Sequence, residues 1–153
     1  MATPSPRPRY EVAHLDDIPA TPYNGSHGFE IPGEWKQLRH YFAIREFSAN
    51  AMVASEPGQQ VVHEHIERAN DDPTKPGDEE LYIVVRGRFR VRLDEESVDV
   101  AAGTLVFVGE PSTVRSFTAL ERDACVLAVG TNPGVEFVVS SFEQEVSLPP
   151  RWS

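Results

Sequence analysis

Thirteen prolines and ten glycines divide this chain of 153 residues into short apolar runs, and that punctuation is its most restrictive feature. The runs are rich in β-branched and aromatic residues, and many are bounded by turn-forming residues. Short runs of this kind at close spacing are typical of a β-sandwich or β-barrel. No apolar run reaches the roughly 18 residues that a membrane-spanning helix needs. We therefore expect one all-β domain with no membrane partner.

The pattern predicts a set of short strands and one helix. We expect the strands at residues 10–15, 44–54, 60–67, 81–85, 88–93, 97–100, 104–108, 114–119 and 124–129. Within residues 34–42, Trp35, Leu38 and Phe42 are spaced for one face of a short N-terminal helix.

Neither an internal repeat nor a linker divides the chain. We expect a flexible Pro-rich tail at residues 1–9, a barrel domain with its N-terminal segment at 10–135, and a C-terminal extension at 136–153.

The net charge indicates which classes of binding partner to expect, and the cysteine content indicates the cellular compartment. The formal net charge of −10 disfavours nucleic acid and anionic membranes as partners. Arg86, Arg88, Arg90 and Arg92 alternate with apolar residues, which indicates the solvated face of a strand rather than an anion-binding patch. Cys125, the single cysteine, lies in an apolar run and is expected to be buried filler, so a reducing cytoplasm is the natural compartment.

One cluster of residues carries recognisable chemistry. His63 and His65 are two positions apart in a predicted strand, so their side chains point to the same side. Glu80 begins the next apolar strand, and a hairpin across the loop would bring its carboxylate beside the two rings. Two imidazoles and a carboxylate suit a divalent transition metal such as Fe, Mn, Ni or Zn. Glu67 shares the face of the histidines and is a candidate ligand or acid/base group.

The spacing of these residues resembles the first motif of the cupin superfamily. The matching positions are Gly58, His63, His65, Glu80 and Gly87, and residues 103–111 look like the opening of the second motif. The resemblance covers roughly residues 44–130, and it extends to small bacterial cupins with a Trp-containing N-terminal segment. It implies an antiparallel double-sheet jelly-roll barrel with a cavity for a small molecule.

Arg115 stands where the resemblance predicts the fourth metal ligand, a histidine. A guanidinium has no lone pair to offer a metal ion. Three accounts stay open: Arg115 clamps an anionic group of a substrate beside a three-ligand metal, it pairs with Glu80 in a metal-free pocket, or it points outward. The second motif also departs at Gly109, where a proline is usual, and the loop before Glu80 is longer than the motif allows.

The resemblance implies two main functions. In the first, a metal held by His63, His65 and Glu80 serves an oxygenase, isomerase, cyclase or decarboxylase acting on a small organic substrate. Arg115 and Glu67 would then be the catalytic side chains, Tyr82 and Phe89 would line the cavity, and residues 66–79 would cover its mouth. In the second, the barrel is a metal-free ligand-binding module without catalytic activity.

A third possibility is an interaction protein that uses the barrel as a scaffold and its C-terminal residues as the contact. Because such sheets pair edges between chains, we also expect a homodimer.

Overall fold

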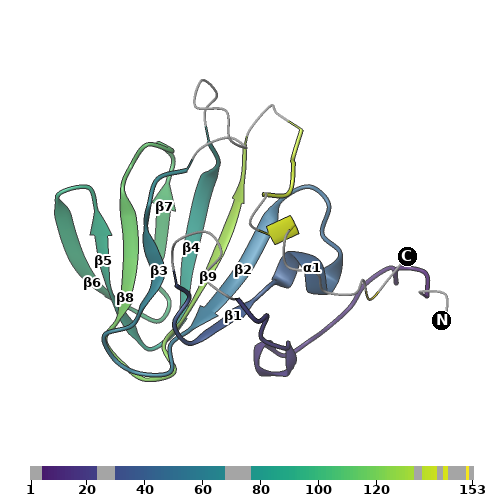
Figure 1. Cartoon of the computed structure of the whole chain (residues 1–153), viewed down its shortest axis with the longest axis horizontal. Coiled ribbons are helices and arrows are strands. Elements are labelled where there is room, and N and C mark those ends of the chain that lie inside the picture. The colour runs from purple at the N-terminus through teal and green to yellow at the C-terminus, as the bar shows by residue number, and fades with distance from the viewer. Residues whose placement is uncertain are drawn as a thin grey trace.

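The computed structural model describes residues 5–23, 30–67, 77–132, 136–140, 143–144 and 151. Within them the chain forms two antiparallel β-sheets that face each other (Figure 1). The five-stranded sheet has the order β1 (Glu34–Lys36), β2 (Ser48–Val53), β9 (Cys125–Thr131), β4 (Glu79–Arg86) and β7 (Leu105–Val108). The four-stranded sheet has the order β3 (Gln60–His65), β8 (Arg115–Ala119), β5 (Arg88–Leu93) and β6 (Glu96–Ala101). The predicted all-β, double-sheet jelly-roll class is confirmed.

Alternation along the strands builds the core between the sheets. In β5, Phe89 and Val91 are fully buried while the arginines that alternate with them are exposed. Phe117 of β8 packs against Phe89 with ring centroids 6.0 Å apart, and against Tyr82 of β4 at 4.6 Å. Aromatic contacts from both sheets therefore build the core between them, and Phe89 belongs to this core rather than to the cavity wall that we expected.

The N-terminal part of the chain departs from two predictions. Residues 10–14 are not a strand, and Leu15–Asp17 is a short 3₁₀ helix, η1. The predicted helix at 34–42 is half strand: β1 pairs with β2, and only Leu38–Phe42 is helical, as α1. Pairing with β2 decides the structure of β1. Its backbone groups form hydrogen bonds with Ala51–Val53 in place of the bonds that a helix would form within itself.

A second apolar layer covers part of the outer face of the five-stranded sheet, over β2 and β9. Leu38 of α1 and Ile18, next to η1, pack against Ala51, Val53 and Cys125. Figure 1 shows α1 lying beside β1 and β2 on that side. Cys125 is fully buried, as the apolar run around it predicts.

Two described C-terminal residues, Glu143 and Arg151, pack back onto the domain. Glu143 pairs with Arg39 of α1 at 2.6 Å and is itself buried. Arg151 pairs with Glu11 at 2.6 Å and lies over the ring of Tyr41. These contacts count against the hypothesis that the C-terminal residues serve as a contact for another protein.

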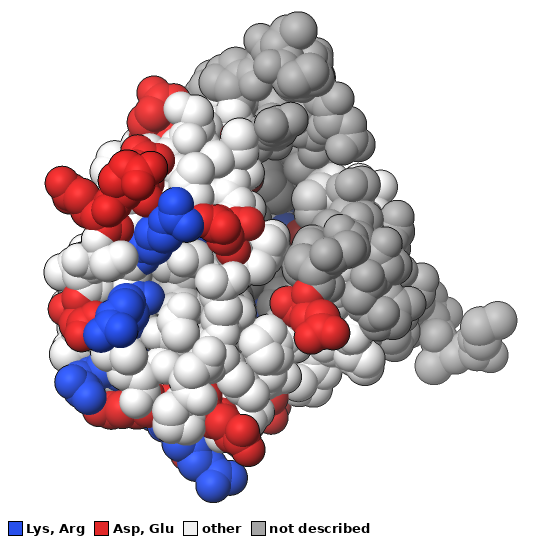
Figure 2. Space-filling view, turned by 60° about the vertical axis from the view of Figure 1, so that its left-hand side comes forward, with Lys and Arg blue, Asp and Glu red and all other residues white. Residues whose placement is uncertain are grey.

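The predicted arginine strip is a solvated face whose charges are neutralised. Arg88 pairs with Glu121, Arg90 with Asp99 and Arg92 with Glu64. Arg86 lies on β4, in the other sheet, and pairs with Asp16. Figure 2 shows basic and acidic side chains side by side on this face, so it does not form an anion-binding patch. None of the described helices has the length and apolar content that crossing a membrane requires.

Candidate functional site

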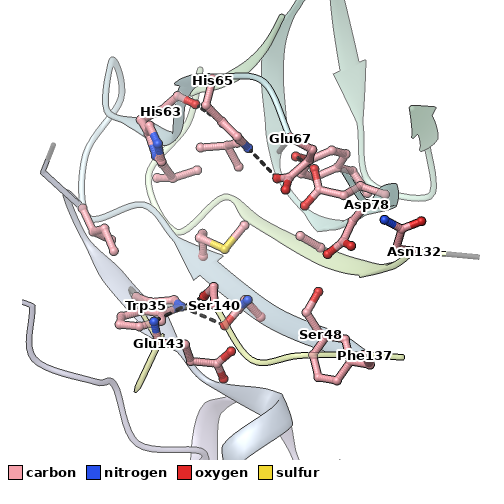
Figure 3. A pocket seen from close by; sticks show the side chains of 18 of the residues that line it. Trp35, Ser48, His63, His65, Glu67, Asp78, Asn132, Phe137, Ser140 and Glu143 are labelled. Carbon is pink, nitrogen blue, oxygen red and sulfur yellow. Dashed lines mark hydrogen bonds and ion pairs between the residues drawn. The ribbon is translucent and has the colours of Figure 1, made fainter. Parts of the chain in front are cut away.

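A cavity of about 330 Å³ opens between the sheets, and Tyr82 of the aromatic core forms part of its wall. Its wall combines residues of β1, β2, β3, β4 and β9 with C-terminal residues that include Glu136, Phe137 and Glu143. Figure 3 shows His63, His65, Glu67 and Asp78 on one side and Trp35 and Glu143 on the other. The volume suits a small organic ligand.

His65 is the best-oriented group in the cavity. Its Nδ1 lies 2.6 Å from the carbonyl oxygen of His63, and its Nε2 lies 3.1 Å from Oε1 of Glu67. A carbonyl only accepts hydrogen bonds, so Nδ1 carries a proton and Nε2 is the atom that faces Glu67. Burial lowers the pKa of His65, but the bonds to Glu67 and the His63 carbonyl raise it more, and the pKa lies above its usual value. The pair therefore shares one proton between Nε2 and the Glu67 carboxylate.

His63 lies beside His65 with a different electrostatic character. The two rings are stacked with centroids 4.7 Å apart, as expected for alternate residues of β3. Burial, and secondarily the charge of His65, lowers the pKa of His63 to about 4. His63 is therefore a neutral polar residue of the cavity wall at physiological pH.

Glu80 reaches the site from β4 in the opposite sheet. Its Oε2 accepts hydrogen bonds from the hydroxyl of Tyr82 and from Nη1 of Arg115, the latter at 3.2 Å. Burial and the charge of Glu67 raise the pKa of Glu80 to about 7, against the opposing effects of Tyr82, His65 and Arg115. Asp78 lines the same cavity, and burial together with the charge of Glu67 raises the pKa of Asp78 as well.

Arg115 is fully buried at the start of β8, so the outward-pointing account is wrong. Besides Glu80, its guanidinium lies 3.8 Å from Glu67 and donates to the carbonyl of Pro111 at 3.3 Å. Its Nε is buried without a hydrogen-bond partner. Arg115 is not among the described residues that line the cavity, which agrees with the ion-pair account rather than with a substrate clamp.

The way these residues come together differs from the prediction in one respect. β3 and β4 do not form a hairpin: they belong to different sheets, and β3 pairs with β8, where His65 stands opposite Arg115. Glu80 meets His65 across the interior of the barrel. Most of the loop expected to cover the mouth, at 66–79, lies outside the described residues.

Three ligand atoms are close enough to share a cation. One each from His65, Glu67 and Glu80 lie within 4.8 Å of one another, and within the described residues this group does not include His63. One imidazole and two carboxylates fit a borderline divalent ion, and the bond from Nδ1 to the His63 carbonyl leaves Nε2 as the ligand atom. Arg115 opposes such an ion, because its permanent charge already occupies one oxygen of Glu80.

Several cavity residues carry no signal in the sequence. Trp35 donates from Nε1 to Oδ1 of Asn50 at 2.9 Å, and both line the wall that faces the histidines. Glu136 and Glu143 come from the C-terminal residues. Nothing in the local sequence pattern indicates that these two residues reach the barrel.

Solved structures of other proteins resemble this chain. A sugar phosphate isomerase of the cupin superfamily from Silicibacter pomeroyi aligns over 80% of this chain and 76% of its own length, with 18% identity and a TM-score of 0.60. A cupin protein from Bacteroides fragilis aligns over 76% and 91%, with 18% identity and a TM-score of 0.54. A protein from Acidithiobacillus ferrooxidans aligns over 65% of this chain, with 17% identity and a TM-score of 0.53, and this chain spans 58% of its length.

No family model and no curated protein sequence matches the chain. At the identities of the structural neighbours, the likeness concerns the fold.

Proposed function

We propose that this chain, which has the fold of the cupin superfamily, binds a small organic molecule in its barrel cavity and transfers protons on it through His65 and Glu67. The observation that carries the proposal is the His65–Glu67 pair at 3.1 Å, oriented by the carbonyl of His63 and facing a cavity of ligand size. An imidazole with a fixed tautomer and a carboxylate that shares its proton are the groups that general acid–base catalysis requires.

The chemistry that suits this pair is proton transfer next to a carbonyl. Glu67 would take the proton from carbon as a carboxylate, and the Nε2–H of His65 would donate to the carbonyl oxygen, giving an enol. Glu67 then gives its proton to the former carbonyl carbon, and the hydroxyl on the neighbouring carbon gives its proton to Nε2 of His65. The carbonyl thereby moves by one carbon, and both side chains regain their starting protonation. The isomerase activity named for the Silicibacter pomeroyi neighbour belongs to this class and supports the proposal.

Glu80, Tyr82 and Arg115 would position the pair. Arg115 offsets the charge of Glu80 and lies 3.8 Å from Glu67, so it holds two carboxylates in place without reaching the cavity. We therefore assign Arg115 as a positioning residue, and Glu67 and His65 as the catalytic residues.

The test is hydrogen exchange in a panel of aldoses, ketoses and amino sugars incubated in D₂O and followed by proton NMR. We expect the wild-type chain to exchange the hydrogen next to the carbonyl of at least one sugar. His65→Gln and Glu67→Gln should each slow that exchange by a factor of about 10²–10⁴. His14→Gln is the matched control, because His14 is exposed and lies outside the cavity. Exchange that persists in both cavity variants would contradict the proposal.

A second candidate, a metal-dependent enzyme, is favoured by the three ligand atoms within 4.8 Å. His65, Glu67 and Glu80 would hold the ion, with His63 as a further ligand if its ring turns. A bound Fe, Mn, Ni or Zn ion would supply Lewis-acid chemistry. Elemental analysis after incubation with each metal tests this: one equivalent that is lost in His65→Ala but kept in His14→Ala favours the metal enzyme, and no bound metal in the wild type excludes it.

A further inference from the structure

Resting on the proposed function, we infer that the ligand of this cavity is a small organic cation, such as a protonated amine. The inference concerns the charge of the ligand and depends on how charged side chains are distributed around the cavity wall.

The described wall carries carboxylates and no side chain of lysine or arginine. Its acidic members are Glu67, Asp78, Glu80, Glu136 and Glu143. They reach the cavity from both of its sides, as Figure 3 shows for Glu67 and Asp78 opposite Glu143. A negatively charged ligand would face carboxylates from either side, whereas a cation would be attracted from both.

Among the described residues, the cationic side chains near the cavity are already engaged. Arg115 is fully buried and held by Glu80, Glu67 and the Pro111 carbonyl, so it cannot turn toward a phosphate without breaking these contacts. Arg39 pairs with Glu143 at 2.6 Å outside the wall. His65 shares its proton with Glu67.

Two acidic side chains of the wall, the partly buried Asp78 and the exposed Glu136, have no basic partner among the described residues. Within the described part of the chain, neither Asp78 nor Glu136 forms an ion pair with a basic side chain. A cationic group of the ligand would supply the missing charge between them and the Glu67–His65 pair.

The remaining wall indicates an organic cation rather than a bare ion. Trp35 is buried with its Nε1 bonded to Asn50, which fixes the plane of its indole ring. Met52 and Phe137 add apolar surface to the same cavity. A carbon skeleton can pack on these side chains, and an indole face attracts an ammonium group. The combination of fixed aromatic surface and uncompensated carboxylates fits an amine.

The experiment is a ligand-observed NMR screen of a fragment library composed of matched cationic, neutral and anionic members. We expect amines to bind at least about tenfold more tightly than their neutral counterparts at low ionic strength, and 0.5 M NaCl to weaken that preference. Asp78→Asn and Glu136→Gln should each reduce it by about threefold or more. Glu95→Gln, in an exposed turn away from the cavity, is the matched control and should leave it unchanged.

The outcomes separate the two proposals. If neutral or phosphate-bearing fragments bind in the cavity as tightly as amines, or if the two charge variants do not change the preference, the inference is wrong while the cavity still binds small molecules. If no fragment of any class binds, the proposed function fails and the inference fails with it.

Discussion

Arg115 illustrates how a single side chain sets the electrostatics of the site. Its guanidinium is fully buried and lies between two carboxylates, at 3.2 Å from Glu80 and 3.8 Å from Glu67. A buried charge is tolerated only when partners compensate it, and removing one partner leaves the others unpaired. The residue therefore stabilises the arrangement on which the proposed chemistry depends.

Replacing Arg115 should be costly for the fold. We expect Arg115→Met to lower the free energy of unfolding by about 3–5 kcal/mol, because Glu80 and Glu67 lose their buried counter-charge. The double variant Arg115→Met with Glu80→Gln should lose less than the single variant. Urea unfolding measures both. Arg90→Met, which breaks an exposed pair with Asp99, is the control and should have little effect. An Arg115→Met protein as stable as the wild type would contradict the ion-pair account.

The two stacked histidines should titrate far apart. Burial lowers the pKa of His63 to about 4. Burial also acts to lower the pKa of His65, but the hydrogen bonds to Glu67 and to the His63 carbonyl raise it above its usual value. Between pH 4 and 6.5 the folded state binds fewer protons at His63 than the unfolded state. The contribution of His63 to stability is therefore complete above pH 6.5 and is lost as the pH falls toward 4. For His65 the sign is opposite: its contribution is complete below 6.5 and is lost as the pH rises through its folded pKa.

Nitrogen-15 NMR of labelled histidines measures both titrations directly. In His65→Gln the pKa of His63 should rise, since a neighbouring positive charge is gone, but should stay below 6.5 because burial is the larger cause. Two histidines that titrate together near 6.5 in the wild type would show that neither ring is held as described.

At the scale of elements, the link between β4 and β5 joins the two sheets through Gly87. This residue has a φ of +72°, and a Cβ there would lie 2.8 Å from Cβ of the fully buried Ala124. The chain can pass from one sheet to the other here only with a residue that tolerates the left-handed region and occupies no side-chain volume.

We expect Gly87→Ala to destabilise the protein by about 2–4 kcal/mol, through backbone strain together with overpacking. Gly58→Ala is a matched control: Gly58 has a φ of +87°, but a Cβ there would meet no atom within 4 Å. Backbone strain alone should therefore cost this control variant about 1 kcal/mol. Thermal and urea unfolding compare the two. Equal losses would show that the contact with Ala124 yields without cost.

At the scale of the whole molecule, the apolar outer face of the five-stranded sheet is only partly covered. α1 and η1 lie over β2 and β9, whereas β7, at the edge of the sheet, leaves Leu105 and Phe107 61% and 64% exposed. The described part of β7 contains no charged residue or proline that would discourage pairing with another edge.

We therefore keep the expectation of a homodimer and assign it to this edge. Light scattering coupled to size-exclusion chromatography should give about twice the chain mass of 17.0 kDa. Phe107→Lys should shift the protein to the monomer, whereas Val98→Lys, on an exposed position of β6, should not. A monomeric wild type would contradict the expected homodimer. A Phe107→Lys variant that is still a dimer would show that the interface is not at the β7 edge.

The features that follow from neighbouring residues could be predicted from the sequence. Alternation gave β5 with its buried Phe89 and Val91, and the same period of two placed His63 and His65 on one side of β3, because side chains of a strand alternate whatever the strand later pairs with. β1 was missed for the complementary reason: Trp35 and its neighbours fit a helical spacing, and only pairing with β2 makes them a strand.

What joins distant parts of the chain was decided by the tertiary structure alone. β3 pairs with β8 rather than with β4, so Arg115 stands opposite His65, while Glu80 arrives across the barrel and Glu143 from the C-terminal residues. These contacts depend on which sheet each strand joins and in which register. Both are set by the packing of the whole core, and no local pattern of residues records them.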